Sequence, residues 1–409
     1  MRAVVLGACG GIGSVAARAV AVVADFDEVV LADLRGADAE AAALSLSGSL
    51  GRDGLSSTAV DVSSPESLAA LLRADDVVVN CTGPFYRFGP PVLRAAIEAG
   101  VTYVDVCDDL DPTLEMLELD GLARERGVRA LIGMGSSPGL ANVFVRLCDE
   151  LLLDRTEAVD IMHVHGGEPS EGAAVVKHRI AAMLRDVPVF VDGEVQMVRM
   201  LDDSGRAFVR ETDFRDVGRL PAYPYPHPET ATLPRHLPDL QRVTNLGVVV
   251  PLSYFELTMA VVRAGLCTAE PLTVGGVTVP SIEVAVAHIL AQRPRLLADA
   301  GVTGPKGCLK VVVSGTKNGE PHTYALSLSS GERGAGEGTG IPAALAAIMM
   351  ARGRIDRTGV FPPEAAVAPL EMLSLVSEVS PAFGMGGPLP LFVQHTRPDG
   401  TVEEVALPL

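Results

Sequence analysis

The chain has 409 residues, which is enough for two or three domains of about 150 residues each. Hydrophobic residues make up 48% of it and charged residues 21%, a globular composition that excludes disordered and fibrous proteins. Because 33 Lys and Arg stand against 51 Asp and Glu, the net charge of −18 repels phosphate backbones and anionic lipids, and we expect neither a nucleic-acid partner nor a membrane partner.

Strand-like and helix-like segments alternate along the first third of the chain. The expected strands are short, apolar and rich in valine: Ala3–Leu6, Glu28–Ala32, Thr58–Val62, Asp76–Asn80, Tyr103–Val106 and Arg129–Ile132. The expected helices are Ile12–Ala24, Ala37–Leu46, Pro65–Leu72 with Ser64 as its N-cap, and Pro90–Ala99. This α/β alternation predicts a doubly wound parallel sheet, a Rossmann dinucleotide-binding domain, over residues 1–142.

The middle of the chain follows a different pattern, in which strand candidates are joined by short polar turns. These candidates are Ala158–Val164, Val187–Val191, Arg206–Val209, Leu246–Val250, Leu272–Val277, Leu309–Ser314 and His322–Leu328. Asn318-Gly319 predicts a type I′ hairpin, whereas the proline-dense segment Pro221–Pro228 is expected to be a loop. We therefore predict a second, α+β domain with a mixed or antiparallel sheet over residues 143–335.

The last part of the chain begins with a glycine-rich segment, Gly334–Gly340, which is expected to be a loop. A helix of small residues, Pro342–Met350, follows it. We assign residues 336–380 to a C-terminal helical segment and residues 381–409 to C-terminal strands.

A glycine-rich turn joins the first predicted strand to the first helix. Gly7, Gly10 and Gly13 form a G-x-x-G-x-x-G variant of the dinucleotide fingerprint, in which Gly11 and Ile12 also approach the cofactor. Backbone N–H groups at the start of a helix can bind a diphosphate there, provided that no Cβ intervenes. Asp33 ends the second strand, twenty residues past Gly13, where its carboxylate can accept hydrogen bonds from the adenine ribose. The alternative is a structural glycine turn without a nucleotide.

The residues after the second, third and fourth strands refine the cofactor prediction. Asp33 favours NAD because it would repel a 2′-phosphate, but Arg35 could bind that phosphate, so NADP stays possible. Asp61 and Val62 either contact the adenine or serve the following turn. The expected lining of the nicotinamide ribose, unless this segment is an ordinary turn, is Cys81, Thr82, Gly83 and Pro84.

Several segments together resemble the saccharopine dehydrogenase and lysine 6-dehydrogenase family. The resemblance lies in four blocks that follow the family order: Asn80–Tyr86 with Val92–Asp105, Gly133–Asn142, His227–Glu229 with Thr232–Arg235, and Thr339–Pro342 with Gly359–Glu364. The chain departs from the family at Ser137, where members often carry an acid, and in the wider spacing of its first glycines.

The resemblance implies an N-terminal Rossmann domain, a catalytic domain that also forms the oligomer, and a C-terminal helix that returns to the Rossmann domain. It implies an enzyme that uses NAD(P) to oxidise the C–N bond of an amino acid or amine, or runs the reverse reaction through an imine. It also implies a homodimer. Two alternatives remain: a nucleotide-binding sensor or scaffold without catalysis, and a carbonyl reductase.

The chemistry needs a group that moves a proton and a group that holds the substrate. For the proton we select Asp108, whose acidic neighbours could raise its pKa, His227, which titrates near neutral pH, and Tyr86. Their alternatives are, respectively, an acidic loop that caps a helix, a structural histidine and a pocket wall. For a substrate carboxylate we select Arg235, with Arg87, Lys177 and Arg179 as alternatives. The family-like segments add Glu229, Ser137 and Asn142 to the substrate site.

No spacing of residues predicts a metal site. His163 and His165 alternate along one predicted strand with Glu168 close by, but no third ligand is required by the pattern. The six cysteines include no C-x-x-C pair and are expected to be reduced thiols of a cytoplasmic protein.

Overall fold

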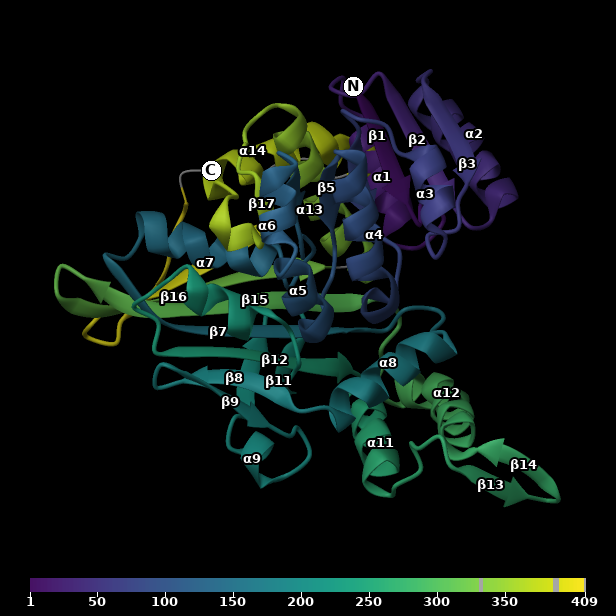
Figure 1. Ribbon diagram of the computed structural model, residues 1–409. Coiled ribbons are helices and arrows are strands. Elements are labelled where there is room, and N and C mark those ends of the chain that lie inside the picture. Colours follow the sequence, from purple (N-terminus) through teal and green to yellow (C-terminus); the bar gives the residue numbers. More distant parts are fainter. Residues whose placement is uncertain (331–333, 385–389, 408–409) are drawn as a thin grey trace. The chain divides into compact units, whose positions relative to one another are not determined.

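The computed structural model in Figure 1 describes residues 1–330, 334–384 and 390–407. The chain divides into two compact units. Unit 1 consists of Met1–Asp154, Ala335–Pro390 and Ala406–Leu409, and unit 2 consists of Arg155–Gly334 and Leu391–Val405. The chain therefore passes from unit 1 into unit 2 after Asp154 and again after Pro390, and it returns to unit 1 at Ala335 and at Ala406. The finer division by function into 1–142, 143–335, 336–380 and 381–409 stays a proposal.

Unit 1 contains a parallel sheet of seven strands in the order β17-β6-β5-β4-β1-β2-β3. The strands are β1 (Arg2–Leu6), β2 (Glu28–Asp33), β3 (Leu55–Ala59), β4 (Val77–Asn80), β5 (Thr102–Asp105), β6 (Arg129–Leu131) and β17 (Gly359–Phe361). The first six have the order of a dinucleotide-binding fold, which confirms the predicted Rossmann domain. The seventh strand, β17, comes from the C-terminal part and was not predicted, because three residues carry no detectable period.

The helices of unit 1 are α1 (Gly13–Ala21), α2 (Gly36–Leu50), α3 (Pro65–Leu71), α4 (Phe85–Ala99), α5 (Leu110–Leu117), α6 (Asp120–Glu125), α7 (Leu140–Leu151), α13 (Gly334–Ala351) and α14 (Pro369–Val379), with short 3₁₀ turns at Pro363–Ala365 and Ser380–Phe383. Ser64 caps α3 as predicted, since its hydroxyl accepts a hydrogen bond from Ser67 N at 3.1 Å.

Helix α13 packs against α1, which confirms the expected return of a C-terminal helix (Figure 1). A Cβ placed on Gly336 would lie 2.9 Å from Gly11 O, and one on Gly340 would lie 2.7 Å from Ile12 O. The prediction that Gly334–Gly340 is a loop was wrong, because these residues form the first turns of α13. Glycine costs about 1 kcal/mol in a helix interior, but here its missing side chain allows the two helices to approach.

Unit 2 is built on a ten-stranded mixed sheet with the main order β10-β11-β12-β7-β15-β16-β18-β19, to which β8 and β9 are added beside β12. Strands β7 and β12 are parallel, and the other pairs are antiparallel. The strands are β7 (Arg155–Gly166), β8 (Val187–Val191), β9 (Glu194–Val198), β10 (Arg210–Phe214), β11 (Gly218–Pro224), β12 (Arg242–Val250), β15 (Lys306–Lys317), β16 (Glu320–Ser330), β18 (Leu391–Thr396) and β19 (Val402–Glu404). The mixed sheet agrees with the predicted fold class.

One face of this sheet is covered by three long helices, α8 (Ala173–Leu184), α11 (Leu252–Arg263) and α12 (Ser281–Asp299) (Figure 1). The other helical elements of unit 2 are short: α9 (Asp203–Arg206), α10 (Glu229–Thr232) and a 3₁₀ turn at Leu233–Arg235. Met162 and Val164 of β7 lie in the same apolar core as residues of these three long helices. Since side chains alternate along a strand, His163 and His165 point to the other face.

Local predictions in unit 2 had mixed outcomes. Asn318 and Gly319, with φ of 54° and 80°, form the predicted hairpin turn between β15 and β16. Leu272–Val277 is not one strand but most of a hairpin, β13 (Pro271–Val274) and β14 (Val277–Pro280), because Gly275 and Gly276 both have positive φ. The predicted strand Arg206–Val209 is wrong, because the Asp202 carboxylate caps the single helical turn α9 instead.

The proline-dense segment was also misassigned in its first half. Gly218–Pro224 is strand β11, in which Pro221 lies opposite Glu211 of β10 and Pro224 lies opposite Leu246 of β12. The fixed φ of proline fits an extended chain, and each proline removes only its own hydrogen-bond donor. Among the described residues, no helix is both long enough and apolar enough to cross a lipid bilayer.

Candidate functional site

The turn between β1 and α1 is closely wound and leaves one open face. Gly7 has φ +74°, and a Cβ on Gly13 would lie only 2.1 Å from Gly7 O, so neither position accepts a larger residue without rearrangement. Gly10 N donates to Gly7 O at 3.0 Å. By contrast, a Cβ on Gly11 would meet no protein atom within 4 Å. Gly11, next to Ile12 at the N-cap of α1, therefore leaves room for a ligand at the helix N-terminus.

Asp33 at the end of β2 connects this turn to the next loop. Its carboxylate accepts hydrogen bonds from Cys9 N at 3.0 Å and from Arg35 N at 3.2 Å. Burial acts to raise the pKa of Asp33, but these backbone N–H groups outweigh it and the pKa is lowered, so the group is ionised at neutral pH. The Arg35 guanidinium is exposed and pairs with Asp38 at 3.0 Å.

The loop after β3 carries the other predicted adenine contacts. Asp61 Oδ1 accepts hydrogen bonds from Ser63 N at 2.9 Å and from the Ser63 hydroxyl at 2.6 Å. The Ser63 hydroxyl and N–H lower the pKa of Asp61. Asp61 thus stabilises its own turn, and Val62 beside it is half-buried.

A buried polar network organises the ends of β4, β5 and β6. Asn80 Nδ2 donates to the Tyr103 hydroxyl at 2.9 Å, and that hydroxyl donates to Asp105 Oδ2 at 3.0 Å. Asp105 Oδ1 accepts from Cys107 N at 3.0 Å and from Gly133 N at 2.8 Å. The sequence analysis missed this network, although each valine-rich strand ending in a polar residue was a signal for it.

The same network shapes the loop predicted to line the nicotinamide ribose, Cys81–Pro84. Asn80 Oδ1 accepts a hydrogen bond from Thr82 N at 3.0 Å. Thr82 Oγ1 is buried, and no hydrogen-bond partner for it occurs in the described part of the chain. A buried hydroxyl of this kind is expected to bind a ligand group. Burial raises the pKa of Cys81 to about 12, so its thiol stays neutral.

The other sequence-derived candidates of unit 1 lie on nearby loops with different degrees of exposure. Asp108 and Ser137 are half-buried, and their two loops meet at Gly133, where a Cβ would lie 3.2 Å from Cys107 O and 2.9 Å from Pro138 Cγ. Tyr86 on α4 is 60% exposed.

Asn142, selected as a substrate-binding residue, is fully buried at the start of α7. Its Oδ1 accepts from Gly139 N at 2.9 Å and its Nδ2 donates to Glu364 at 2.8 Å. These contacts give Asn142 the role of positioning the Pro138-Gly139 turn.

Unit 2 contains an aromatic cluster, which we call the histidine cluster: His163, Tyr225 and His227. The two imidazole rings stack with centroids 5.0 Å apart, and the Tyr225 ring meets each of them edge-on at 5.1 Å. A Cβ on Gly247 of β12 would lie 2.4 Å from His163 Cε1, so this glycine leaves the space that the His163 ring fills.

A buried relay extends from the cluster. His163 Nε2 lies 3.2 Å from Asn245 Oδ1, and Asn245 Nδ2 donates to Glu229 Oε1 at 3.2 Å. The structure therefore brings the predicted residues His227 and Glu229 together, whereas Arg235 is exposed at the end of its 3₁₀ turn. The sequence analysis considered His163 only as a metal ligand and missed Tyr225 and Asn245.

Burial keeps the histidine cluster uncharged. It lowers the pKa of His163 to about 3 and lowers that of His227 well below its ordinary value, with the charge of His163 as a further cause for His227. Each ring thus has one N–H donor and one acceptor nitrogen at neutral pH. Such rings can orient an amine by hydrogen bonding, and within the described residues no group of three or more side chains is arranged to hold a metal ion.

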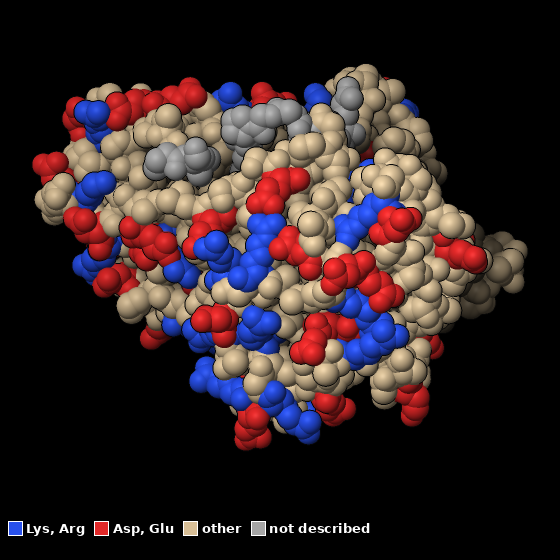
Figure 2. Space-filling view, turned by 90° about the horizontal axis from the view of Figure 1, so that it is seen from above, with Lys and Arg blue, Asp and Glu red and all other residues tan. Residues whose placement is uncertain are grey.

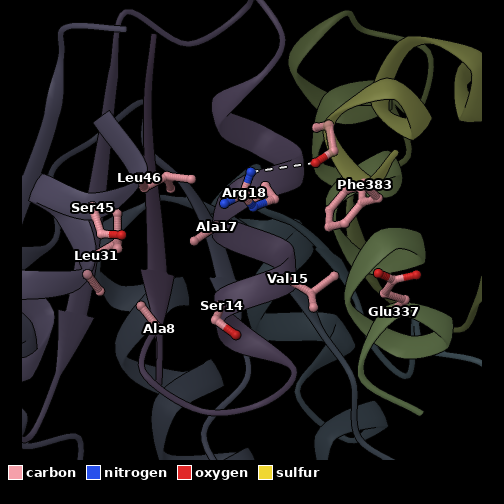
Figure 3. A pocket seen from close by; sticks show the side chains of 12 residues that line it. Ala8, Ser14, Val15, Ala17, Arg18, Leu31, Ser45, Leu46, Glu337 and Phe383 are labelled. Carbon is pink, nitrogen blue, oxygen red and sulfur yellow. Dashed lines mark hydrogen bonds between the residues drawn. The ribbon is translucent and has the colours of Figure 1, made fainter. Parts of the chain in front are cut away.

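A pocket of about 500 Å³ is lined by residues of α1, α2 and the C-terminal segments that carry Glu337 and Phe383 (Figure 3). Small side chains, including Ala8, Ala17 and Ser45, leave it open, and Arg18 beside it donates to Ala382 O at 3.5 Å. On the face shown in Figure 2, acidic and basic side chains are interspersed and no broad basic patch forms.

Comparison with known proteins shows similarity to the saccharopine dehydrogenase group. Residues 3–131 match the saccharopine dehydrogenase NADP binding domain. The chain is 23% identical to carboxyaminopropylagmatine dehydrogenase of Synechocystis, with 88% of this chain and 92% of the relative covered. It is 26% identical to carboxynorspermidine synthase of Vibrio alginolyticus, with 75% and 77% covered.

Solved structures share the fold at low identity. Apo saccharopine dehydrogenase (L-Glu forming) from Saccharomyces cerevisiae has a TM-score of 0.65 at 16% identity and covers 96% of this chain and 99% of its own. Homospermidine synthase from Legionella pneumophila, solved in complex with NAD, has a TM-score of 0.55 at 12% identity, with 94% and 90% covered. The chain is thus a saccharopine dehydrogenase-like NAD(P)-binding oxidoreductase, and its residues 3–131 belong to the saccharopine dehydrogenase NADP binding domain family.

Proposed function

We propose that this protein uses NAD(P)H to reduce an imine formed from an amine and a carbonyl compound, or runs the reverse oxidation of the C–N bond. The observation that carries the proposal is the extent of the match: 88% of this chain, including most of unit 2, aligns with a relative named for an aminopropylated, carboxylated agmatine. A second relative is named for a carboxylated norspermidine. Both names denote amines with a carboxyl group.

The nucleotide turn fits a dinucleotide. The open face at Gly10, Gly11 and Ile12 would hold the diphosphate, Asp33 would hold the adenine ribose, and the buried Thr82 hydroxyl would meet the nicotinamide half. When bound, the reduced nicotinamide supplies a hydride to the imine carbon.

In unit 2, the neutral imidazole and phenol groups of the histidine cluster offer polar but uncharged partners for a substrate. His227 or Asp108 moves the proton that the imine nitrogen gains or loses, and Glu229 orients the cluster through Asn245. Tyr86, Ser137 and Arg235 remain proposed contacts of the proton path and of the substrate.

Turnover measurements test this proposal. Purified protein is mixed with NADH or NADPH and with a diamine plus an aldehyde that carries a carboxylate; lysine, saccharopine and diamines are offered with NAD(P) in the reverse direction. Nucleotide oxidation that requires both amine and carbonyl is the expected result. Oxidation with the carbonyl alone would instead support a carbonyl reductase, and nucleotide binding without any turnover would support a sensor.

The choice between NAD and NADP depends on Asp33, for which NAD is our proposal. Asp33→Asn keeps an oxygen that can accept from Cys9 N but removes the charge that repels a 2′-phosphate. We expect the ratio of Kd for NADPH to Kd for NADH to fall by at least about tenfold, or about 1.4 kcal/mol. Glu40→Gln, which removes an exposed charge from α2, is the matched control. Equal ratios in both variants would refute the role of Asp33.

A further inference from the structure

The hairpin of β13 and β14 in unit 2 extends beyond the ends of α11 and α12, as Figure 1 shows. Its two strands form a sheet of their own and pair with no other strand among the described residues. Gly275 and Gly276, with φ of 57° and 83°, form the two-residue turn at its tip. Except for the half-buried Val279, the residues from Pro271 to Pro280 are exposed. We call this segment, Pro271–Pro280, the arm.

The two faces of the arm differ in chemistry. Alternate residues of a strand share a face, so alternate cross-strand pairs do as well. One face carries the pair Thr273 and Thr278, whose hydroxyls lie 3.3 Å apart. The opposite face, which we call the aliphatic face, consists of Leu272, Val274, Val277 and Val279.

The aliphatic face is in contact with water in a single copy of the chain. Val274 is 57% and Val277 is 62% exposed. Leu266 and Val284, on the segments that enter and leave the arm, are each 38% exposed and add further apolar surface. A strand pair with one apolar face ordinarily buries that face, and an isolated two-stranded hairpin is only marginally stable in water. The arm therefore favours a partner that covers its aliphatic face.

The edges of the arm do not suit a partner that adds a strand. In a two-residue hairpin the residues next to the turn, Val274 and Val277, bond each other, so the outward backbone groups belong to Thr273 and Thr278 and to the open end. At the open end Pro271 lies opposite Pro280, and neither has an N–H group. Each strand of the arm thus offers a single outward donor, and contact through the face is favoured over contact through the edge.

The charge of the chain favours a second copy as the partner. Two copies that each carry a net charge of −18 repel one another, as an anionic lipid surface would repel either of them. No residue from Pro271 to Ile282 is charged, so here two copies can approach without placing like charges together. A second copy also brings an identical pleated aliphatic face, and two such faces can pack about 10 Å apart as in a β-sandwich.

We propose that the aliphatic face of the arm packs on the same face of a second copy of this chain, so that the protein forms a dimer around a two-fold axis. In such a symmetric contact each residue near the axis meets its own counterpart. The inference concerns assembly and does not depend on the proposed reaction.

Sedimentation velocity of the full-length protein from about 1 to 100 μM tests this contact, and the wild type is expected to dimerise in that range. Val277→Glu places a carboxylate from each copy in the interface and should weaken association by at least about 100-fold. Thr278→Glu, which places the same charge on the opposite face of the same strand, is the matched control and should leave the dimer intact.

A charge exchange then tests whether the two arms meet each other. Val277→Lys should weaken association as Val277→Glu does, because like charges face each other across the axis. An equimolar mixture of the two variants should recover a dimer, since each carboxylate then faces an ammonium group. Val277 is exposed in a single copy, so both variants should fold as the wild type does. Circular dichroism checks this, and Val274→Glu and Val274→Lys serve if they do not.

The opposing results are equally specific. A wild type that stays monomeric at every concentration, a dimer that survives Val277→Glu, or a dimer that Thr278→Glu dissociates would each overturn the proposal. A mixture of Val277→Glu and Val277→Lys that remains monomeric would overturn it too, because the arms would then not face each other. A monomeric wild type that cosediments with phosphatidylcholine vesicles would assign the aliphatic face to lipid instead.

Discussion

Substitution of Gly13 by Ala is expected to abolish nucleotide binding, with a loss of affinity of at least about 100-fold, and to destabilise unit 1 by about 1–3 kcal/mol. The added Cβ would lie 2.1 Å from Gly7 O and 2.8 Å from Gly7 C, and both are backbone atoms that cannot rotate away. The turn must open to accept it, and the N–H groups at the start of α1 would then no longer converge on a diphosphate.

Two further glycines separate the effect on folding from the effect on binding. Gly11→Ala meets no protein atom within 4 Å, so it should leave the thermal unfolding temperature unchanged yet weaken nucleotide binding, because its Cβ points into the proposed diphosphate position. Gly48→Ala, exposed in the interior of α2, should leave binding unchanged and stabilise the protein by about 0.5–1 kcal/mol.

Binding is measured by the fluorescence of NADH. The chain contains no Trp, so this signal is read without tryptophan background. If Gly13→Ala and Gly11→Ala bound NADH as tightly as Gly48→Ala does, the turn would not be the diphosphate site, and the cofactor assignment would be wrong.

Substitution of Asp105 by Asn is expected to remove a pH dependence of stability. Burial raises the pKa of Asp105 from 3.8 to about 6, against the opposing hydrogen bonds from Gly133 N and Cys107 N. Between pH 4 and pH 6 the folded protein therefore holds a proton that the unfolded chain has lost. The contribution of Asp105 to the free energy of unfolding is largest below pH 4, falls by about 3 kcal/mol as the pH rises to 6, and is constant above that.

The asparagine side chain in the Asp105→Asn variant is uncharged at every pH, so the difference in unfolding free energy between wild type and variant should fall by about 3 kcal/mol from pH 4 to pH 7. Urea unfolding at a series of pH values measures this difference. Tyr103→Phe, which removes the hydroxyl that donates to Asp105 Oδ2, should move the midpoint of the change to higher pH. Parallel stability curves for wild type and Asp105→Asn would disprove the raised pKa.

The two experiments concern features that differ in how far sequence reveals them. The glycine turn and Asp33 follow local rules, because the need for positive φ at Gly7 and for close packing at Gly13 leaves a pattern within seven residues. The cap at Ser64 and the hairpin at Asn318-Gly319 were predictable for the same reason: the side chains act on their own backbone.

Errors arose where a distant contact outweighs a local preference. Gly334–Gly340 has the composition of a loop. It is nevertheless helical, because glycines without a side chain allow this segment to pack closely against α1. The segment around Pro221 is a strand because β10 and β12 pair with it on either side. Secondary-structure propensity describes the local preference of a residue. Hydrogen-bonded strands or packed helices from distant parts of the chain can override it.

For this protein, composition, alternating periods and one glycine spacing were sufficient to establish a parallel nucleotide-binding unit followed by a mixed-sheet unit. The identity of the chemical groups was not accessible in that way. His163 meets Asn245 only because β7 and β12 are neighbouring strands, and Tyr225 and His227 reach the same ring because β11 pairs with β12. Such contacts join residues that are tens of positions apart, and the local sequence does not indicate which distant side chain will bury a polar group.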